Sequence, residues 1–450
     1  MVVSKGNQNV TATIHSPPPA RYHLVGVAGT GMNALAQVLL AAGHAVSGSD
    51  RYVDEGRKPA VVRQLCDAGL RLAAQDGTGV SAATTALVHS AAVEPDNADL
   101  AAAQRLGVPV LRRSEMLARL TCGRRLVGIA GTSGKTTVTG MLGWVLTSLG
   151  CDPTVVNGGA LLDWATDRAP GNVRIGASDL WVLELDESDR SLPMFRPHRA
   201  IITNISADHF EEREARELFE TFAGQVAETV IAPLAEQDPR VRPGPRDGWW
   251  TVECDGAPCA VPLPGRHNAC NALQCLLLCR AMGLDVAAAA TALSRFRGIA
   301  RRIEQIGQPR GITVVDDYAH NPAKIRASWS ALRALHPRVI AVWRPHGFGP
   351  LRLMLEGLTN VFAELCGADD RLFLLPAYYA GGTADRSIDA DVLAERLRKR
   401  HVPVAFAPDY ETLGAMIKAA AAPGDLVLIM GARDPDLPRF ARRLLVQLAQ

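Results

Sequence analysis

The residues that most directly indicate chemistry are Gly131-Thr-Ser-Gly-Lys-Thr-Thr137. A glycine turn followed by a lysine and a hydroxyl is typical of a phosphate-binding loop, because Gly134 lets backbone amides approach a phosphate. Lys135 can reach the outer phosphates and Thr136 can hold Mg²⁺. Ile129 stands where the general pattern has a glycine, so an ordinary strand-turn-helix with a solvated lysine is the alternative. We expect nucleotide contacts from Gly131, Thr132, Ser133, Gly134, Lys135, Thr136 and Thr137.

Two groups of polar residues follow apolar runs downstream of this loop. Asp186-Glu-Ser-Asp189 comes after residues 180–185, and Asp208-His209 comes after residues 200–205. Ligands of open α/β sheets sit at the carboxyl ends of the strands, so these side chains are candidates for holding Mg²⁺ near the phosphates. A solvated acidic turn and a capping histidine are the alternative. Two such strand ends in one P-loop domain favour the metal site.

A second glycine turn lies near the amino terminus. Gly26-Val-Ala-Gly29-Thr-Gly31 follows a predicted strand, and Asp50 ends the next one. This βαβ pattern is typical of dinucleotide folds, in which the acid can hold a ribose or base, although many such turns bind nothing. The interpretation of the protein as a nicotinamide-dependent oxidoreductase would be supported by this turn alone. A P-loop has no place in that chemistry.

Composition limits the class of protein. The 450-residue chain has a formal net charge of +2 and no long basic or acidic block, so neither nucleic acid nor an anionic membrane is indicated as a partner. Nine scattered cysteines show no zinc spacing, and we expect reduced thiols in a cytoplasmic protein. Residues 1–20 lack a signal-peptide core and are predicted to be a disordered lead-in. No apolar run reaches the roughly 18 residues that a membrane span needs.

The elements needed to position these residues form three α/β domains. We predict boundaries at 21–122, 123–298 and 299–450, with a Rossmann-like first domain, a central P-loop ATPase-like mixed sheet and a Rossmann-like third domain. A charged helix is expected over 211–228, and a surface loop over 233–246. Asn268 suits the N-cap of a helix running to Met282, which would leave Asn271 facing a ligand.

Taken together, the motifs resemble the Mur ligase family, most closely its UDP-N-acetylmuramate-recognising branch. The residues that carry the likeness are Gly29-Thr-Gly-Met32 with Ser47-Gly-Ser-Asp50, Arg113-Ser-Glu-Met-Leu117, Gly131 to Thr137, Asp186 to Asp189, Thr203-Asn204 with Asp208-His209, Gly265-Arg-His-Asn268 with Asn271, Arg301-Arg302, and Asp317-Tyr-Ala-His-Asn-Pro322. They extend over nearly the whole chain in family order.

The resemblance implies an ATP- and Mg²⁺-dependent ligase that activates a carboxylate as an acyl phosphate, which an amine then attacks. It implies UDP-sugar binding by Gly29, Thr30, Gly31, Met32, Asp50 and Ser90. It implies catalysis by Lys135, Glu187, His209 and Arg302, with Thr136, Glu187 and His209 as metal ligands. Asn271 would contact adenine, and Arg302 and Asp317 would reach ATP from the hinge and the third domain.

The acceptor end departs from the family pattern. Gly347 and Pro350 occupy the positions of two family arginines. Binding of the acceptor would therefore depend on His320, Arg344, His346 and Arg352. L-Alanine is the expected acceptor, and an L-Ala-D-Glu-diaminopimelate peptide or another amine is the alternative. A non-catalytic regulator that binds ATP or the UDP-sugar is a lesser one. Ser133 replaces the usual histidine, no carbamylated lysine is expected, and the chain is expected to be a monomer or homodimer.

Overall fold

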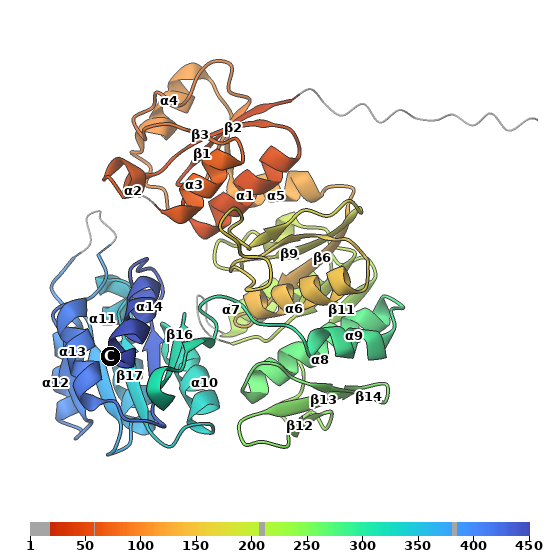
Figure 1. Cartoon of the computed structure of the whole chain (residues 1–450). Helices are drawn as coiled ribbons and strands as arrows, with labels where there is room; N and C mark the ends of the chain where they lie inside the picture. The colour runs from red at the N-terminus through yellow and green to blue at the C-terminus, as the bar shows by residue number, and fades with distance from the viewer. Residues whose placement is uncertain (1–18, 58, 207–211, 380–384) are drawn as a thin grey trace, which may run out of the picture. The chain divides into compact units, whose positions relative to one another are not determined.

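The computed structural model describes residues 19–57, 59–206, 212–379 and 385–450. Within them the chain forms two compact units, which divide between Leu117 and Ala118. The first unit holds one parallel sheet, and the second holds two further large sheets, each with its own helices (Figure 1). The predicted fold class, three α/β domains with largely parallel sheets, is confirmed.

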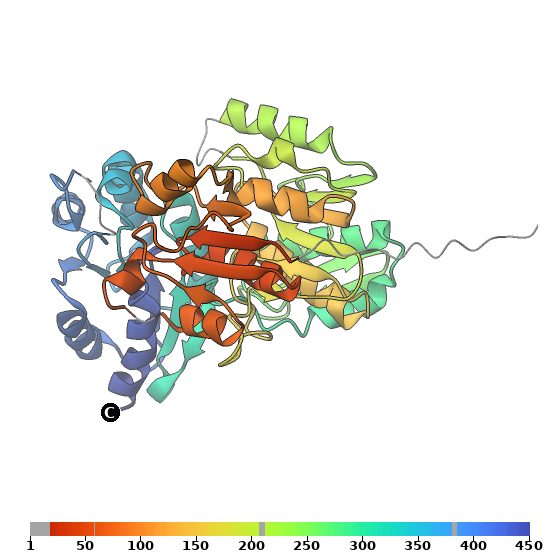
Figure 2. The same ribbon diagram turned by 90° about the horizontal axis from the view of Figure 1, so that it is seen from above.

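The first sheet has the strand order β3-β2-β1-β4-β5, and every neighbouring pair is parallel. Its strands β1 and β2, drawn in red, run side by side in the same direction in Figure 2. Its central strand contributes Leu24 and Val25, both fully buried. The strands are β1 (Arg21–Val25), β2 (Ala45–Ser49), β3 (Arg71–Leu72), β4 (Ala86–His89) and β5 (Val110–Arg112), and the helices are α1 (Thr30–Ala41), α2 (Arg51–Asp54), α3 (Ala60–Asp67), α4 (Ala98–Leu106) and α5 (Arg113–Thr121).

A fully buried polar network connects this sheet to α4. Asp99 accepts hydrogen bonds from Ser49 Oγ at 2.5 Å and from the Gly77 amide at 2.9 Å, and its Oδ2 lies 3.4 Å from His23 Nε2. Burial alone would raise the pKa of Asp99, but the hydrogen bonds from His23 and Ser49 outweigh it and lower the pKa below its usual value. The carboxylate is therefore stabilised in its charged form.

Asp99→Ala leaves these donors buried and unpaired, so we expect it to destabilise the first domain by about 3 kcal/mol. Because the folded pKa is depressed, the contribution of Asp99 is present above its unfolded pKa of about 3.9 and lost as pH falls through the folded value. Hydrogen exchange of first-domain peptides at pH 7 measures the loss. Asp96→Asn, at an exposed acid nearby, is the control. Equal protection in both variants would contradict the prediction.

The central domain has a sheet of order β11-β10-β6-β9-β7-β8, parallel except for β8, and a small antiparallel sheet β12-β13-β14. Helices α6 and α8 supply much of the core, including Val138, Met141 and Leu276. The strands are β6 (Arg125–Ala130), β7 (Thr154–Val156), β8 (Val173–Arg174), β9 (Leu180–Glu184), β10 (Arg199–Ile202), β11 (Thr229–Ile231), β12 (Val241–Pro243), β13 (Trp250–Cys254) and β14 (Ala257–Ala260), and the helices are α6 (Lys135–Ser148), η1 (Leu192–Met194), α7 (Glu212–Ala223), α8 (Arg266–Ala281) and α9 (Val286–Leu293).

Three local predictions in this domain were wrong. The helix expected to reach residue 228 ends at Ala223, because the chain then turns into β11. The expected loop 233–246 contains β12, which pairs with β13. Asn268 is not the N-cap: α8 begins one turn earlier, after Gly265 at φ +92°, and the side-chain Nδ2 of Asn268 donates back to the Pro264 carbonyl at 2.8 Å.

The third domain has the strand order β15-β16-β20-β17-β18-β19, parallel except for β15. One face is covered by α10, α11 and α12 through residues such as Trp329, Phe362 and Leu393, and the other by α13 and α14. The strands are β15 (Glu304–Gly307), β16 (Thr313–Asp317), β17 (Val339–Trp343), β18 (Arg371–Leu374), β19 (Val404–Phe406) and β20 (Leu426–Met430), and the helices are η2 (Pro309–Gly311), α10 (Pro322–Arg333), α11 (Phe348–Leu365), α12 (Ala390–Arg398), α13 (Tyr410–Ala420) and α14 (Leu437–Ala449).

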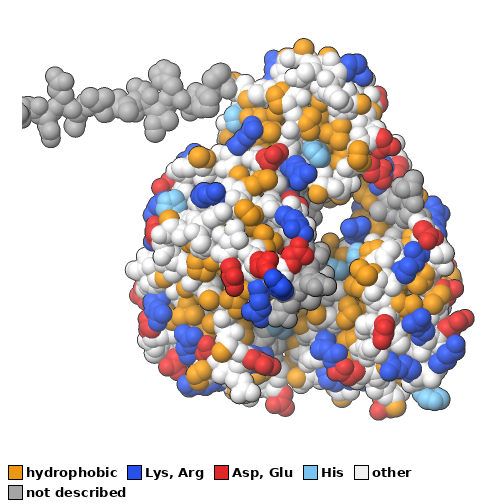
Figure 3. Space-filling view, turned by 180° about the vertical axis from the view of Figure 1, so that it is seen from behind, with side chains coloured by type: hydrophobic (Ala, Val, Ile, Leu, Met, Phe, Trp, Pro, Cys, Tyr) orange, Lys and Arg blue, Asp and Glu red, His pale blue; other side chains and the backbone are white. Residues whose placement is uncertain are grey.

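The distribution of charge and the character of the helices both agree with the composition. On the face shown in Figure 3, acidic and basic side chains are interspersed and do not separate into fields of one sign. None of the helices in the described residues combines the length and apolar character needed to cross a bilayer.

Candidate active site

The glycine loop connects β6 to α6 at the carboxyl end of the central sheet. Gly134 is the N-cap of α6 and has φ +85°, a left-handed conformation that favours glycine. Gly131 has φ +126°, and a Cβ there would lie 2.1 Å from Thr203 Oγ1. Both glycines are therefore required by the backbone and its neighbours. The loop leaves the α6 amides free to face an anion.

Side chains that follow β10 hold this loop in place. Thr203 Oγ1 donates to the Ser133 carbonyl at 2.6 Å, and Asn204 Nδ2 donates to the same oxygen at 2.8 Å. Asn204 Oδ1 accepts from the Ser133 amide at 3.1 Å. Ser133 is thus fixed through its backbone, whereas Thr132 also uses its hydroxyl, which donates to the Ser206 carbonyl. The loop conformation is preorganised by its neighbours.

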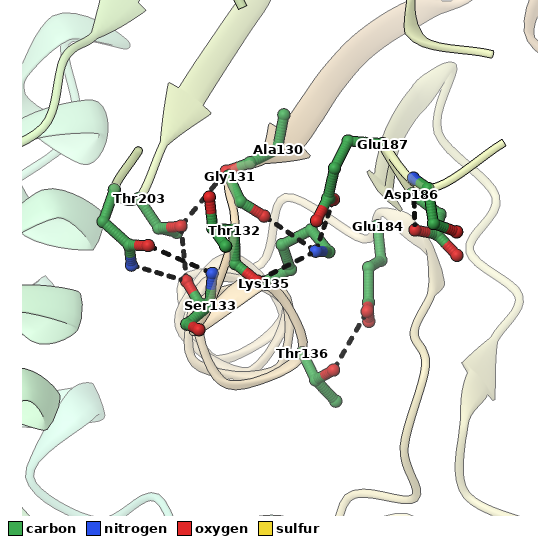
Figure 4. A network of polar contacts seen from close by, with 12 residues as sticks. Ala130, Gly131, Thr132, Ser133, Lys135, Thr136, Glu184, Asp186, Glu187 and Thr203 are labelled. Carbon is green, nitrogen blue, oxygen red and sulfur yellow. Dashed lines mark hydrogen bonds and ion pairs between the residues drawn. The ribbon is translucent and has the colours of Figure 1, made fainter. Parts of the chain in front are cut away.

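Lys135 forms a close ion pair with Glu187 (Figure 4). Its Nζ lies 2.5 Å from Glu187 Oε2 and donates to the Gly131 carbonyl at 2.7 Å. Burial raises the pKa of Glu187, despite the opposing attraction of Lys135. Glu187 Oε1 is buried and has no hydrogen-bond partner among the described residues. The structure thus brings together two of the predicted site residues and leaves one carboxylate oxygen available.

Thr136 connects two further side chains. Its hydroxyl donates to Glu184 Oε1 at 2.9 Å and accepts from Arg302 Nη2 at 3.2 Å. Glu184 Oε2 also accepts from the Gly158 amide at 2.6 Å. Glu184 was not among the predicted site residues. The available signal was a single charged residue inside the apolar run of β9, which a buried strand tolerates only when its charge is engaged.

The oxygen donors here fit a hard divalent cation. Thr136 offers a hydroxyl, Glu187 an oxygen without a partner in the described chain, and Glu184 a neighbouring carboxylate, all of which suit Mg²⁺. The predicted third ligand, His209, lies outside the described residues. Within the described residues, no three acids, histidines or cysteines converge on a point where a metal could sit. Thr136 and Glu187 remain the predicted ligands that the structure places here.

A cavity of about 460 Å³ opens beside the loop, within the range of small-molecule sites. Ser133 and Gly134 line it at the loop, Asn268 and Asn271 at α8, and Arg302 and Asp317 at the hinge. Asn271 lies close against Gly134, because a Cβ added to Gly134 would lie 2.8 Å from Asn271 Oδ1. Predicted nucleotide residues of both domains therefore line one space, although Lys135 and Thr136 are not among its lining residues.

Asp317, at one wall of the cavity, is held by several hydrogen bonds from its own domain and the hinge. Its carboxylate is fully buried and accepts from the Ile303 amide at 2.7 Å, the Ala319 amide at 2.8 Å and Ser328 Oγ at 2.9 Å. Burial raises its pKa. These bonds show that Asp317 fixes the hinge at one wall of the cavity, because its oxygens already have donors from the chain. Direct contact of this carboxylate with ATP stays a prediction.

Two adjacent arginines at the hinge have different partners. Arg301 Nε lies 3.2 Å from Asp316 Oδ2, and its terminal nitrogens donate to the carbonyls of Gly431 and Ala432. Arg302 instead reaches the hydroxyl of Thr136. Each guanidinium lies 5.0 Å from the centre of the Tyr318 ring. Arg301 therefore binds the third domain, and Arg302 is left to face the phosphate loop.

Gly134→Ala tests the geometry of this loop. The added Cβ would clash with Asn271, and alanine would have to take up a left-handed backbone conformation, so we expect ADP affinity to fall by about tenfold or more. Isothermal titration calorimetry with ADP measures the effect. Gly283→Ala, at a positive-φ glycine with open space around it, controls for backbone strain alone. Equal losses in the two variants would contradict a specific role for Gly134.

In the first domain, the predicted UDP-sugar residues have different environments. Gly29 and Thr30 are exposed at the start of α1, with Gly31 half-buried behind them, whereas the Met32 side chain is buried. Contact of Met32 with the UDP-sugar stays a prediction. Ser90 follows β4 at the same sheet edge. Arg113, quoted for the family likeness but not predicted as a binding residue, packs its guanidinium over Gly31: a Cβ there would lie 2.9 Å from Arg113 Nη1. A cation at a helix N-terminus favours an anion.

Asp50 has a structural role that the sequence did not predict. It is buried, and its two oxygens accept from the Ala28 amide at 2.9 Å and the Tyr52 amide at 3.0 Å. Burial raises its pKa, although these two amide hydrogen bonds oppose the rise. The acid therefore shapes the glycine turn and caps α2. Contact with a ribose or base stays a prediction.

The predicted acceptor residues do not all lie together. His320 and His346 do, with ring centroids 4.7 Å apart. Arg344 is already engaged, through an ion pair with Asp434 and a hydrogen bond to Tyr410 Oη. Arg352 is exposed on α11 and pairs with Asp385 and Ser387. The sequence could not indicate that Asp434 neutralises Arg344.

Comparison with known proteins gives consistent results. Three family descriptions match: "Mur ligase family, catalytic domain" over residues 21–125, "Mur ligase middle domain" over 129–222, and "Mur ligase, glutamate ligase domain" over 301–433. UDP-N-acetylmuramate–L-alanine ligase of Synechococcus sp. (strain JA-2-3B'a(2-13)) is 34% identical, covering 93% of this chain and 91% of the relative. The ligase of the same name from Gloeobacter violaceus is 35% identical, covering 91% and 92%.

Solved structures share the fold. The UDP-N-acetylmuramate-alanine ligase of Thermotoga maritima superposes with a TM-score of 0.77 at 23% identity, covering 95% of this chain and 98% of that one. A murein peptide ligase of Psychrobacter arcticus gives a TM-score of 0.68 at 23% identity, covering 96% and 99%.

Proposed function

Because the chain belongs to the Mur ligase family, we propose that it joins the carboxylate of UDP-N-acetylmuramate to the amine of L-alanine in cytoplasmic peptidoglycan synthesis, at the expense of ATP. The observation that carries the proposal is that Arg302, from the hinge, reaches the hydroxyl of Thr136, the residue after Lys135. Arg302 also lines one cavity together with Ser133 and Gly134 of the loop. Two cations and a hydroxyl at a preorganised loop suit phosphoryl transfer, which depends on charge neutralisation and positioning.

In the proposed reaction, a carboxylate oxygen of the sugar attacks the γ-phosphorus of ATP, and the bond to ADP breaks. The amine then attacks the acyl carbon of the acyl phosphate, inorganic phosphate leaves, and the amine loses a proton. Lys135 and the α6 amides orient the phosphates, and Arg302 neutralises charge from the hinge. Thr136, Glu187 and His209 would hold Mg²⁺, which when bound neutralises phosphate charge.

The remaining predictions are part of this proposal. Gly29, Thr30, Gly31, Met32, Asp50 and Ser90 hold the UDP moiety. To these we add Arg113, whose guanidinium lies over Gly31. Asn271 contacts the adenine, and His320 and His346 lie at the acceptor end. Domain boundaries at 21–122, 123–298 and 299–450, and a monomeric or homodimeric state, are proposed on the same basis.

One observation favours a second acceptor. A Cβ on Gly349 would meet nothing within 4 Å, and one on Gly347 would meet only Pro350, so this end has space for a larger group. One solved neighbour is a murein peptide ligase. The second candidate is therefore the same ligation with an L-Ala-D-Glu-diaminopimelate peptide in place of L-alanine.

An amine panel tests the proposal. With ATP, Mg²⁺ and UDP-N-acetylmuramate, we expect ADP release that depends on L-alanine and one amide formed per ADP. Release with the tripeptide but not with L-alanine would favour the second candidate. Release with neither, while ATP and the UDP-sugar still raise the melting temperature, would favour a non-catalytic binding protein instead.

A further inference from the structure

Three arginines follow parallel strands at the carboxyl end of the third sheet, and they differ in how their charge is engaged. Arg344, after β17, pairs with Asp434 and also donates to the Pro376 carbonyl at 3.0 Å. Arg386, after β18, lies over the Tyr379 ring at 3.8 Å. Arg433, after β20, is exposed and makes no hydrogen bond, ion pair or ring contact within the described part of the chain.

Arg433 belongs to the turn at the middle of this edge. Its strand, β20, lies between β16 and β17. The Gly431 amide donates to the Asp317 carbonyl of β16 at 3.2 Å, and a Cβ on Gly431 would lie 3.2 Å from the Arg344 carbonyl. The loops that follow β16 and β17 carry His320 and His346. The turn containing Arg433 is therefore flanked by the two loops that bring these histidines together.

The backbone on both sides of Arg433 is held firmly. Arg301 binds the carbonyls of Gly431 and Ala432, at 2.5 Å and 2.8 Å. On the other side, the buried Asp434 binds Arg344 and accepts from the Asp436 amide at 2.8 Å. Ala432 and Asp434 are both buried, and only the residue between them is exposed. The fold thus presents, from a fixed turn, the guanidinium of Arg433, which makes no hydrogen bond or ion pair in the described residues.

We propose that Arg433 binds the carboxylate of the acceptor amino acid and so determines acceptor specificity. The inference rests on the proposed ligase function. A carboxylate that leaves water needs a cation, and a guanidinium can bind both of its oxygens. Arg344 could serve only by giving up its buried partner, Asp434, at a large cost. Arg433 has no such partner to lose.

L-Alanine and L-alaninamide separate this role from a structural one, because the amide lacks the carboxylate charge. We expect the wild-type protein to prefer L-alanine. Arg433→Gln should raise KM for L-alanine by about 30-fold, leave L-alaninamide and ATP unchanged, and so remove the preference. Arg433→Lys should restore part of it. Arg386→Gln is the matched control, because Arg386 is the other arginine of this edge without an acidic partner in the described residues. This variant should keep the preference for L-alanine.

Hydroxylamine trapping keeps this test separate from that of the ligase function. The acyl phosphate forms before the acceptor is needed, so wild type and Arg433→Gln should give equal hydroxamate from ATP and UDP-N-acetylmuramate. Absence of hydroxamate from the wild type would overturn the ligase function itself. Three results would overturn the role of Arg433 alone. The first is normal hydroxamate from Arg433→Gln together with a retained preference for L-alanine over L-alaninamide. The others are loss of this preference in Arg386→Gln, and no use of L-alanine by the wild type.

Discussion

Lys135→Ala is expected to lower kcat for nucleotide-dependent amide formation by about 10³-fold, because it removes the one cation that the loop holds against the phosphates. Lys135 Nζ is fixed by the Gly131 carbonyl and by Glu187, so its position does not depend on a flexible side chain finding the ligand. A coupled assay of ADP release with UDP-N-acetylmuramate and L-alanine measures the loss.

Two comparisons make the Lys135 result specific. Lys399→Ala, at an exposed lysine after α12, should keep wild-type turnover. Lys135→Ala leaves Glu187 buried without its cation, but burial has already raised the pKa of that carboxyl, so it can take up a proton. We therefore expect Lys135→Ala to remain folded by circular dichroism. Undiminished turnover in this folded variant would contradict the assignment.

Glu187→Gln is expected to change nucleotide binding and turnover in opposite directions. The 2.5 Å ion pair holds Lys135, so a nucleotide must compete with Glu187 for the same cation. Removing the charge should raise ADP affinity in EDTA by about tenfold. The corresponding free energy is smaller than that of a typical charge-assisted hydrogen bond. Turnover with Mg²⁺ should fall by about 10²-fold or more, because a predicted metal ligand is lost.

Calorimetry with ADP, in EDTA and in Mg²⁺, separates the two effects of Glu187→Gln. Asp189→Asn is the control from the same acidic cluster: Asp189 accepts from the Ser191 amide and makes no ion pair among the described residues. It should leave both affinities near wild type. If metal-free affinity fell in Glu187→Gln, the carboxylate would be aiding nucleotide binding directly, and the competition argument would be wrong.

The phosphate loop could be predicted in detail because its chemistry is local. A glycine turn, a lysine and a hydroxyl are adjacent in sequence, and backbone geometry alone aims them at one anion. The strand-helix order that makes three α/β domains was likewise readable from apolar runs. Arg302 was identified through the family resemblance, and the structure places its guanidinium on Thr136, which the hinge motif alone could not show.

Residues whose charge is balanced by distant partners could not be predicted. Arg344 looked available, but Asp434, 90 positions away, neutralises it. Asp50 and Asp317 were predicted to contact ligands, and the structure shows that each also accepts hydrogen bonds from two backbone amides, which the sequence did not indicate. Glu184 was overlooked because its partner is Thr136, on another element. Such pairing depends on tertiary contacts, which residue type and spacing do not encode.

The central claim is that a carboxylate oxygen of the substrate attacks the γ-phosphorus of ATP beside Lys135 and forms an acyl phosphate. The most direct measurement uses UDP-N-acetylmuramate labelled with ¹⁸O in both carboxylate oxygens, with ATP, Mg²⁺ and L-alanine, and mass analysis of the phosphate released. Attack by the carboxylate transfers one of its oxygens, so each phosphate should carry one ¹⁸O atom and the amide should keep the other. Unlabelled phosphate, with both labels retained on the sugar acid, would show that water attacks the nucleotide and would contradict the account.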